Sequence, residues 1–275
     1  MDLKACATKS GRCSCSNPNL QQLPEAVRKA VVAPPGRLLV VADLSQIELR
    51  CAAELSGDEA MRQIFRDGGD VHTLNAEDFI GHGLEELPSD EREVARSKAK
   101  RIGFGTLYGS GASGLAASAW SMYRIDMPVE EAERFKARFY ARYPQLRRWQ
   151  SRTADAARVT GVLRSVAGRP LRAEWEAVQP LKWTTCCNFP VQSSAADVML
   201  LATARVHAAL EDLDAQLLLQ IHDELLVECA EALAPKVERL LIEHMTAAYR
   251  ELFPDAPVLG LVDVASRACW AKPPK

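Results

Sequence analysis

Short apolar runs at three places along the chain predict buried strands, and two of these runs lie next to acidic residues. The run 37–43 follows Pro34-Pro35-Gly36 and ends in Asp43, which indicates a strand that terminates in a carboxylate. Residues 215–229 predict two strands joined by a turn at His222-Asp223-Glu224. Residues 258–265 predict a last strand.

Between these runs, apolar positions recur at helical spacing or lie in Ala-rich stretches. Helices are predicted over 45–55, 90–108, 129–150, 192–212 and 231–252, and a hairpin over 161–172 with its turn at Gly168. Ser89 or Asp90, which follow Pro88, is the expected N-cap of the second helix. Because helices and strands do not alternate in a βαβ pattern, the expected fold class is α+β with an antiparallel sheet.

The composition is that of an ordinary globular protein, and it limits where nucleic-acid contacts can come from. Of 275 residues, 48% are hydrophobic and 25% are charged, with a formal net charge of −2. Any contact with nucleic acid must therefore come from a local basic patch. Cys13, Cys15, Cys186 and Cys187 lack partners at zinc-binding spacing, so free thiols in a reducing compartment are expected. No apolar run reaches the ~20 residues that a membrane span needs.

Asp43 and Asp223 are the first candidates for chemistry. Two acids at the tips of neighbouring strands can point into one small volume, where paired carboxylates suit Mg²⁺. Two such ions about 3.5–4 Å apart can clamp the attacking and leaving oxygens of a phosphoryl transfer. The strand pattern alone leaves an alternative open, in which Asp43 caps the helix that follows it and Asp223 fills a turn.

The predicted helix 90–108 carries a row of cationic and aromatic residues. Four residues recur at four-residue spacing and therefore share one face: Arg96, Lys100, Phe104 and Tyr108. This face spans about 18 Å and offers two cations for a polyphosphate and two aromatic planes for a base or sugar. The alternative is a solvated charged face with two core aromatics. Gly103 and Gly105, which cost roughly 1 kcal/mol each inside a helix, favour a face left bare for a close approach.

Three segments, in this order, resemble the motifs of family A of the DNA polymerases, the group of bacterial DNA polymerase I and its phage relatives. Asp43-Leu-Ser-Gln-Ile-Glu-Leu-Arg50 resembles motif A, and His222-Asp223-Glu224 resembles motif C. The row from Arg96 to Tyr108-Gly109 resembles motif B, the fingers helix. Four flanking segments agree in kind and order: Gly11-Arg12, Pro18-Asn19-Leu20-Gln21, Asp70-Val71-His72-Thr73 and Asn188-Phe189-Pro190-Val191-Gln192.

The resemblance implies a right-hand polymerase fold, with a palm built on an antiparallel sheet, mainly helical fingers and no thumb. The palm would comprise 1–69 and 176–275, and the fingers 70–175. The implied activity is template-directed addition of deoxynucleotides to a primer 3′ end with two Mg²⁺ ions, for which Mn²⁺ can substitute. The implied partners are primer–template DNA, deoxynucleoside triphosphates and a protein that supplies a thumb or processivity. The implied location is the cytoplasm of a bacterium or phage-infected cell, with no membrane contact.

The resemblance also assigns roles to the matching residues. Asp43, Asp223 and the Leu44 carbonyl would hold the metals, and Lys100 would share in catalysis. Glu48 would be a steric gate against the 2′-hydroxyl of a ribonucleotide. The incoming nucleotide would be bound by Glu48, His72, Arg96, Lys100, Phe104 and Tyr108. The primer–template would be contacted by Arg12, Asn19, Gln21, Asn188, Gln192 and His222.

Two departures from the family pattern leave other functions open. Few residues precede Gly11-Arg12, where the family has a thumb and, further upstream, an exonuclease. One alternative is therefore a DNA-binding or scaffolding remnant, or half of a split polymerase that is inactive without a partner. Thr184 stands where an Arg often occurs, which removes one cation on the primer side. A single-subunit RNA polymerase is a second alternative, against which Glu48 and Glu224 argue.

Overall fold

The computed structural model describes residues 2–123, 127–176 and 180–271. The chain divides into two compact units, and each is described by itself. The sheet unit comprises Met1–Cys51, Ser165–Arg169 and Gln192–Lys275. The helical unit comprises Ala52–Arg164 and Pro170–Val191. Two helices, α2 (Ile47–Ser56) and α9 (Trp183–Leu210), run from one unit into the other.

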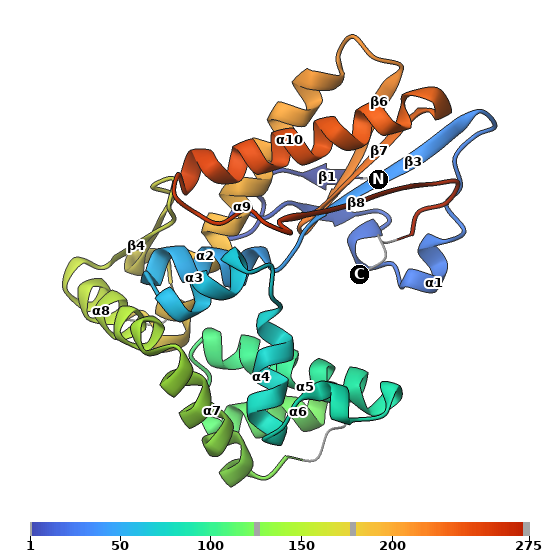
Figure 1. The fold of residues 1–275 in the computed structure, drawn as a ribbon. Coiled ribbons are helices and arrows are strands. Elements are labelled where there is room, and N and C mark those ends of the chain that lie inside the picture. Colours follow the sequence, from blue (N-terminus) through green and yellow to red (C-terminus); the bar gives the residue numbers. More distant parts are fainter. Residues whose placement is uncertain (1, 124–126, 177–179, 272–275) are drawn as a thin grey trace. The chain divides into compact units, whose positions relative to one another are not determined.

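The sheet unit is built on four antiparallel strands in the order β6-β7-β3-β8 (Figure 1). Their bounds are β3 (Arg37–Leu44), β6 (Ala215–Ile221), β7 (Glu224–Ala230) and β8 (Val262–Arg267). The other elements are β1 (Asp2–Lys4), β2 (Ser14–Ser16), α1 (Glu25–Arg28), α10 (Ala234–Leu252) and the short 3-10 helices Leu20–Gln22 and Glu231–Leu233. The expected antiparallel sheet is confirmed, as is the turn at Asp223.

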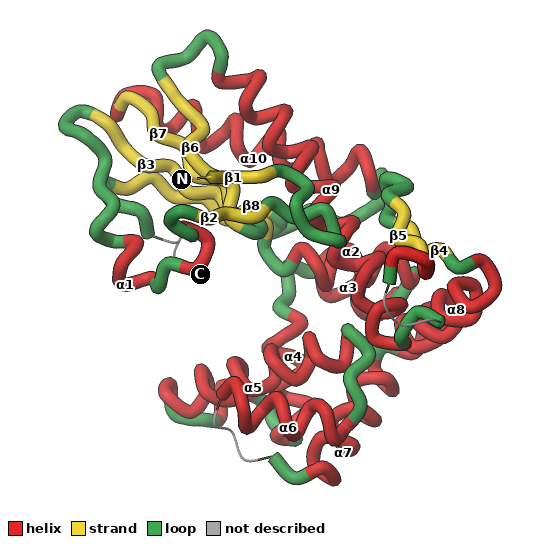
Figure 2. The backbone as a smooth tube through the Cα atoms, turned by 180° about the vertical axis from the view of Figure 1, so that it is seen from behind, coloured by secondary structure: helices red, strands yellow, loops and turns green. Residues whose placement is uncertain are grey.

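The two faces of this sheet have different covers. Helix α10 crosses one face (Figure 1), while the β1–β2 hairpin lies on the other side, as seen from behind in Figure 2. On that second side, Leu39 and Val41 of β3 pack in one cluster with Trp270. Because side chains alternate along a strand, Asp43 belongs to the same face as Leu39 and Val41. The acidic end of β3 therefore continues a face whose other residues are apolar and buried.

The helical unit consists mainly of packed helices (Figure 2). The helices are α3 (Glu59–Arg66), α4 (Val71–Ile80), α5 (Ser89–Leu107), α6 (Ala112–Tyr123), α7 (Val129–Arg142) and α8 (Pro144–Thr160). The hairpin β4 (Val162–Arg164) and β5 (Pro170–Arg172) and the 3-10 helices Leu84–Glu86 and Ala173–Trp175 complete it. No helix in the described part of the chain is both long and apolar enough to cross a membrane.

The single helix expected over 129–150 is wrong, because Pro144 divides it. Helix α7 ends at Arg142, and α8 begins at Pro144, which has no N–H to donate to the preceding turn. The residue before a proline is disfavoured in helical conformation, and Tyr143 has φ −118° and ψ 66°. The proline thus starts a new helix at its first position, where its missing N–H is tolerated.

Several other element boundaries also differ from the expected ones. The N-cap of α5 is Pro88, so the helix begins at Ser89 and neither Ser89 nor Asp90 caps it. Helix α9 begins at Trp183 and continues through Pro190, well before the expected start at 192. Helices α3, α4 and α6 were not predicted. For α3 the signal was local, because Met61 and Phe65 lie one turn apart and are both buried.

Asp58 joins α3 to the start of α8 inside the helical unit. Its side chain is fully buried, and Oδ1 accepts from the N–H of Met61 at 3.1 Å. Oδ2 accepts from the N–H groups of Gln145 and Leu146 at 3.0 and 3.2 Å. One carboxylate therefore satisfies the first turns of two helices.

Asp58→Ala is expected to lower the free energy of unfolding by about 3 kcal/mol, because three buried N–H groups lose a charged acceptor. Urea unfolding measures the change. The matched control is Asp155→Ala in α8, whose carboxylate is exposed and bonds Arg158, and a change below about 0.5 kcal/mol is expected there. Equal losses in the two variants would refute the double-cap role.

Candidate active site

The acidic residues of the sheet unit meet at the end of β3. Asp43 lies opposite Glu224 of β7 and Asp263 of β8 in the antiparallel register. The N–H of Leu44 donates to the carbonyl oxygen of Asp223 at 2.9 Å, which joins the β6–β7 turn to the end of β3. The structure thus places the backbone of Leu44, one residue after Asp43, next to the backbone of Asp223. Directly opposed residues share one face, so Glu224 and Asp263 are the nearest acidic neighbours of Asp43 in the sheet.

Asp263 was missed by the sequence reasoning. It lies inside the strand predicted over 258–265, but nothing in the pattern indicated that this strand pairs with β3. The register of β8 places Asp263 opposite Asp43. A long-range strand pairing of this kind is decided by packing, and no local signal reports it.

Glu224 is buried and bonded to other side chains of the sheet unit. Only 2% of the residue is exposed. The indole Nε1 of Trp270 donates to its Oε1 at 2.8 Å, and Arg28 approaches Oε2 at 3.5 Å. The guanidinium of Arg28 also lies 4.7 Å from the centre of the Trp270 ring. These contacts attach the start of β7 to segments from both ends of the chain.

Glu48 and Arg12 form a half-buried ion pair beside the acidic residues. Glu48 lies in the first turn of α2, and its carboxylate accepts from the Arg12 guanidinium. Burial, and then the charge of Asp223, raises the pKa of Glu48 to about 8, while the contact with Arg12 favours the ionised form. Burial lowers the pKa of Arg12, and the charge of Asp223 acts to raise it. Asp223 is therefore close enough to act on both partners of this pair.

The predicted primer–template residues near the N-terminus lie against the end of β6. Asn19 accepts from the N–H of Gln21 through Oδ1 at 3.1 Å. The side-chain amide of Gln21 donates to the carbonyls of Cys13 and Gln220, both at 3.4 Å. This loop is thus tied to the strand that leads into the Asp223 turn.

His222 and Gln192 also belong to the sheet unit, whereas Asn188 belongs to the helical unit. His222 has φ +51°, a left-handed conformation that is uncommon outside glycine. It is the residue immediately before Asp223, so the turn that presents Asp223 has a constrained backbone. Gln192 and Asn188 lie one turn apart on α9.

The predicted nucleotide-binding residues of the helical unit lie on α4 and α5, where His72 is buried and Arg96, Lys100 and Phe104 are half-buried. Asp70 caps α4 by accepting from the N–H groups of His72 and Thr73. Its other oxygen accepts from the Arg96 guanidinium of α5. Burial acts to raise the pKa of Asp70, but the Arg96 contact outweighs it and the pKa is lowered. The Arg96 guanidinium is therefore paired with a carboxylate of the protein in this structure.

Aromatic rings lie side by side from α4 along α5. The His72 ring lies 5.3 Å from the Phe104 ring, and the Phe104 ring lies 5.9 Å from that of Tyr108, with 29° between the planes. Lys100 lies one helical turn from Arg96 and one from Phe104. The sequence prediction of one cationic and aromatic face is confirmed for the part within α5, and Tyr108 follows as its C-cap.

The expectation that Gly105 leaves this face bare is wrong. A Cβ at Gly105 would lie 2.3 Å from Cδ2 of Leu115. The end of the Leu115 side chain of α6 therefore covers this position, and a larger residue at 105 would require that side chain to turn away. At Gly103 a Cβ would have only an ordinary contact, 3.4 Å from Nδ2 of Asn75. Helix packing therefore accounts for Gly105, and it does not account for Gly103.

Comparison with known proteins identifies the fold and the family. The family model described as DNA polymerase family A matches residues 2–272. The thermostable DNA polymerase I of Thermus aquaticus is 37% identical over 254 residues, which are 88% of this chain and 29% of that protein. DNA polymerase I of Aquifex aeolicus is 31% identical over 261 residues, 94% of this chain and 44% of that protein. The chain thus spans less than half the length of these relatives.

A solved structure agrees over nearly the whole chain. The POL domain of Pol1 from M. smegmatis, in complex with DNA primer-template and dNTP, has a TM-score of 0.84 and 31% sequence identity. The match covers 98% of this chain and 47% of that one. The fold is therefore that of a polymerase domain. The chain belongs to DNA polymerase family A.

Proposed function

We propose that this chain is the catalytic core of a template-directed DNA polymerase, which adds deoxynucleotides to a primer 3′ end by two-metal phosphoryl transfer. The observation that supports this most is the junction of β3 with the β6–β7 turn, where Leu44 bonds Asp223 and Asp43 lies one residue away. The M. smegmatis domain, which is bound to primer-template DNA and dNTP, supports the same substrates for this chain.

The acidic residues suit Mg²⁺ in a polymerase. Mg²⁺ is usually held by one or two carboxylates together with substrate phosphates and water. Asp43, Asp223 and the Leu44 carbonyl are such a donor set, and Mn²⁺ accepts the same oxygens. Bound ions would supply stabilisation of the attacking and leaving oxygens.

The helical unit supplies groups for the nucleotide. Arg96 and Lys100 would bind the triphosphate, so that positive charge stabilises the leaving pyrophosphate. Arg96 is paired with the Asp70 carboxylate in this structure, so a triphosphate would compete with that carboxylate for the guanidinium. Phe104 would pack on the sugar and base of the nucleotide, and Tyr108 would hold the stacking position on the template side.

The proposal is tested by a primer-extension time course with the purified chain, Mg²⁺ and a competitor DNA trap. Elongation by at least one nucleotide before capture by the trap is the expected result. Binding of primer–template without any extension would instead favour the DNA-binding or scaffolding alternative. Repeating the assay with added protein fractions would then distinguish a split polymerase from an inactive remnant.

Binding of primer–template is expected to weaken steeply with salt, because Lys and Arg contacts to phosphates release counterions. We expect a loss on the order of a hundredfold to a thousandfold between about 50 and 200 mM salt, measured by fluorescence anisotropy. Potassium glutamate and potassium chloride should be compared at equal concentration, so that specific anion effects are separated from screening. An affinity that does not change with salt would show that the chain makes few contacts to the DNA phosphates.

A further inference from the structure

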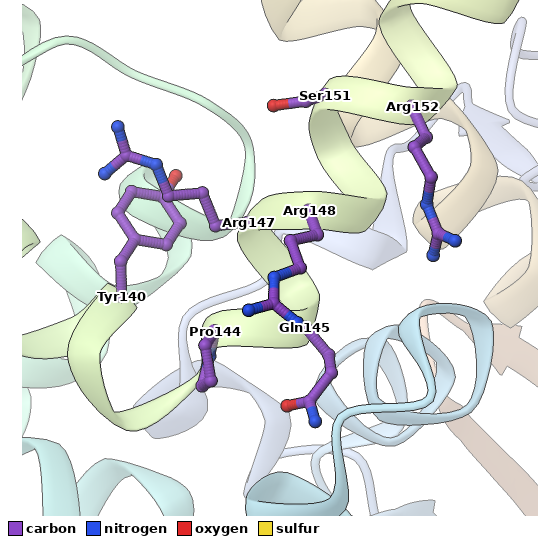
Figure 3. Close-up of a pocket in the computed structure, with 7 residues that line it drawn as sticks. All are labelled: Tyr140, Pro144, Gln145, Arg147, Arg148, Ser151 and Arg152. Carbon is purple, nitrogen blue, oxygen red and sulfur yellow. The ribbon is translucent and has the colours of Figure 1, made fainter.

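A basic hollow lies on α8 in the helical unit, and none of its lining residues is among those assigned to the nucleotide on α4 and α5. It has a volume of about 650 Å³ and opens between the end of α7 and the first turns of α8. Its lining includes Tyr140, Gln145 and Ser151 and three arginines, Arg147, Arg148 and Arg152 (Figure 3). We call this feature the α8 hollow. Its lining contains no carboxylate.

The arginines of the α8 hollow have no acidic partner among the described residues. Arg142, just before the hollow, is bonded to Asp78, and Arg158, further along α8, is bonded to Asp155. No ion pair with a described carboxylate involves Arg147, Arg148 or Arg152. Arg142 and Arg158 are thus each paired with a carboxylate of the protein, whereas the three arginines of the hollow are available to an anion from outside.

The floor of the hollow is held in place by buried contacts. The Arg147 guanidinium lies 5.0 Å from the centre of the Tyr140 ring. Figure 3 draws the two side chains next to each other. The Tyr140 hydroxyl donates to Oε1 of Gln150 at 2.9 Å, and Gln150 is fully buried and donates to the Leu107 carbonyl at 2.8 Å. One cation of the hollow is therefore positioned by a cation–π contact on a ring that is itself fixed.

A further cation adds to the positive potential. Partial burial, and then the nearby charge of Arg147, lowers the pKa of Lys136 on α7. The Lys136 ammonium donates to the Ser110 carbonyl at 2.6 Å, which holds it near the hollow. Three arginines thus line one open surface, and Lys136 lies close enough to Arg147 for their charges to repel. An anion bound there would relieve that repulsion.

The arrangement of the cations favours a strand over a compact anion. Arg148 and Arg152 are one helical turn apart, about 6 Å along α8, and extend from the exposed side of the helix. One row of cations along one helix can follow one phosphodiester backbone. Arg147 covers one face of the Tyr140 ring, and contacts from arginines to phosphates carry no base information, so binding here would not depend on sequence.

We propose that the α8 hollow binds the phosphodiester backbone of single-stranded DNA, and that this strand is the unpaired template. The inference rests on the proposed polymerase function for the identity of the strand. Arginine suits this role because its planar guanidinium can donate two parallel hydrogen bonds to one phosphate. The hollow adds a contact to the template that none of the family motifs in this chain supplies.

The test compares Arg148→Ala/Arg152→Ala with the wild-type chain on two labelled primer–templates, one with a long 5′ template overhang and one with an overhang of a single nucleotide. Fluorescence anisotropy should show binding about tenfold weaker for the long overhang at about 0.1 M salt, and unchanged binding for the short one. The salt slope for the long overhang should fall by about 1.4, since each single-strand phosphate contact contributes about 0.7. The matched control is Arg158→Ala, which removes an arginine of the same helix that is paired with Asp155.

Equal affinity of the variant and the wild type for the long overhang would overturn the proposal, and so would equal losses on both templates. Competition with pyrophosphate and with a polyglutamate peptide separates the other anions. Displacement of the long overhang from the hollow by either one at micromolar concentration would assign the site to free phosphates or acidic peptides and also overturn the proposal. Primer extension on the short overhang reports the proposed function separately. If extension fails but overhang-dependent binding is lost in the variant, the hollow is supported and the polymerase activity is not.

Discussion

Asp223→Asn is expected to reduce primer extension by at least about a thousandfold while leaving primer–template affinity unchanged within about threefold. The substitution keeps the size of the side chain and the backbone bond from Leu44, so the turn between β6 and β7 is preserved. It removes one of the two carboxylates proposed to hold the metals. Single-turnover extension measures the chemical step, and anisotropy without nucleotide measures binding.

Asp263→Asn is the matched control for this experiment. Asp263 lies opposite Asp43 on β8, as Glu224 does on β7, but it has no proposed role as a ligand. Extension by this variant is expected to remain within about threefold of the wild type. Retained extension in Asp223→Asn would refute the metal assignment, and loss in Asp263→Asn alone would move the metal site towards β8.

Glu48→Ala is expected to raise the incorporation of ribonucleotides relative to deoxynucleotides by about a hundredfold. The Glu48 side chain, on the first turn of α2, is proposed to crowd the 2′ position of the sugar, and alanine removes it. The ratio of kcat/KM for the two nucleotide types measures the effect. An unchanged ratio would refute the proposal that Glu48 excludes ribonucleotides.

The Arg12 contact makes a second variant necessary. Glu48→Ala also leaves the half-buried Arg12 guanidinium without its carboxylate, so a general loss of activity or stability is expected beside the change in selectivity. Glu48→Gln keeps the volume and an acceptor oxygen. It should therefore retain most of the exclusion of ribonucleotides, and its unfolding midpoint should lie between those of the wild type and Glu48→Ala.

Much of the local structure was predictable from the sequence. The apolar run before Asp43 and the turn at Asp223 are local patterns, and both were found where they were expected. The spacing of Arg96, Lys100 and Phe104 placed them on one helical face, because the helical repeat is a property of the backbone. The break between α7 and α8 was not predicted, although its cause is also local. Pro144 ends the preceding helix even though the apolar periodicity continues through it.

Contacts between distant segments could not be predicted in the same way. No pattern near Arg12 indicated an ion pair with Glu48, and no pattern near Arg96 indicated one with Asp70. The partners of each pair are far apart in the sequence, and only the packing of the chain brings them into contact. The spacing of charged residues along the chain therefore does not predict them. The prediction that Gly105 leaves its helix face bare failed for the same reason. The side chain of Leu115, on the neighbouring helix, covers this position.

By itself the sequence determined which residue types stand at strand ends and along helix faces, because these depend on the fixed repeats of strands and helices. The ordered motifs around Asp43, Arg96 and Asp223 were also enough to indicate the polymerase family. Only the tertiary structure decided that Asp263 lies opposite Asp43 and that the three arginines of the α8 hollow have no carboxylate partner among the described residues. Strand register and charge pairing are set by long-range packing, which no local repeat specifies.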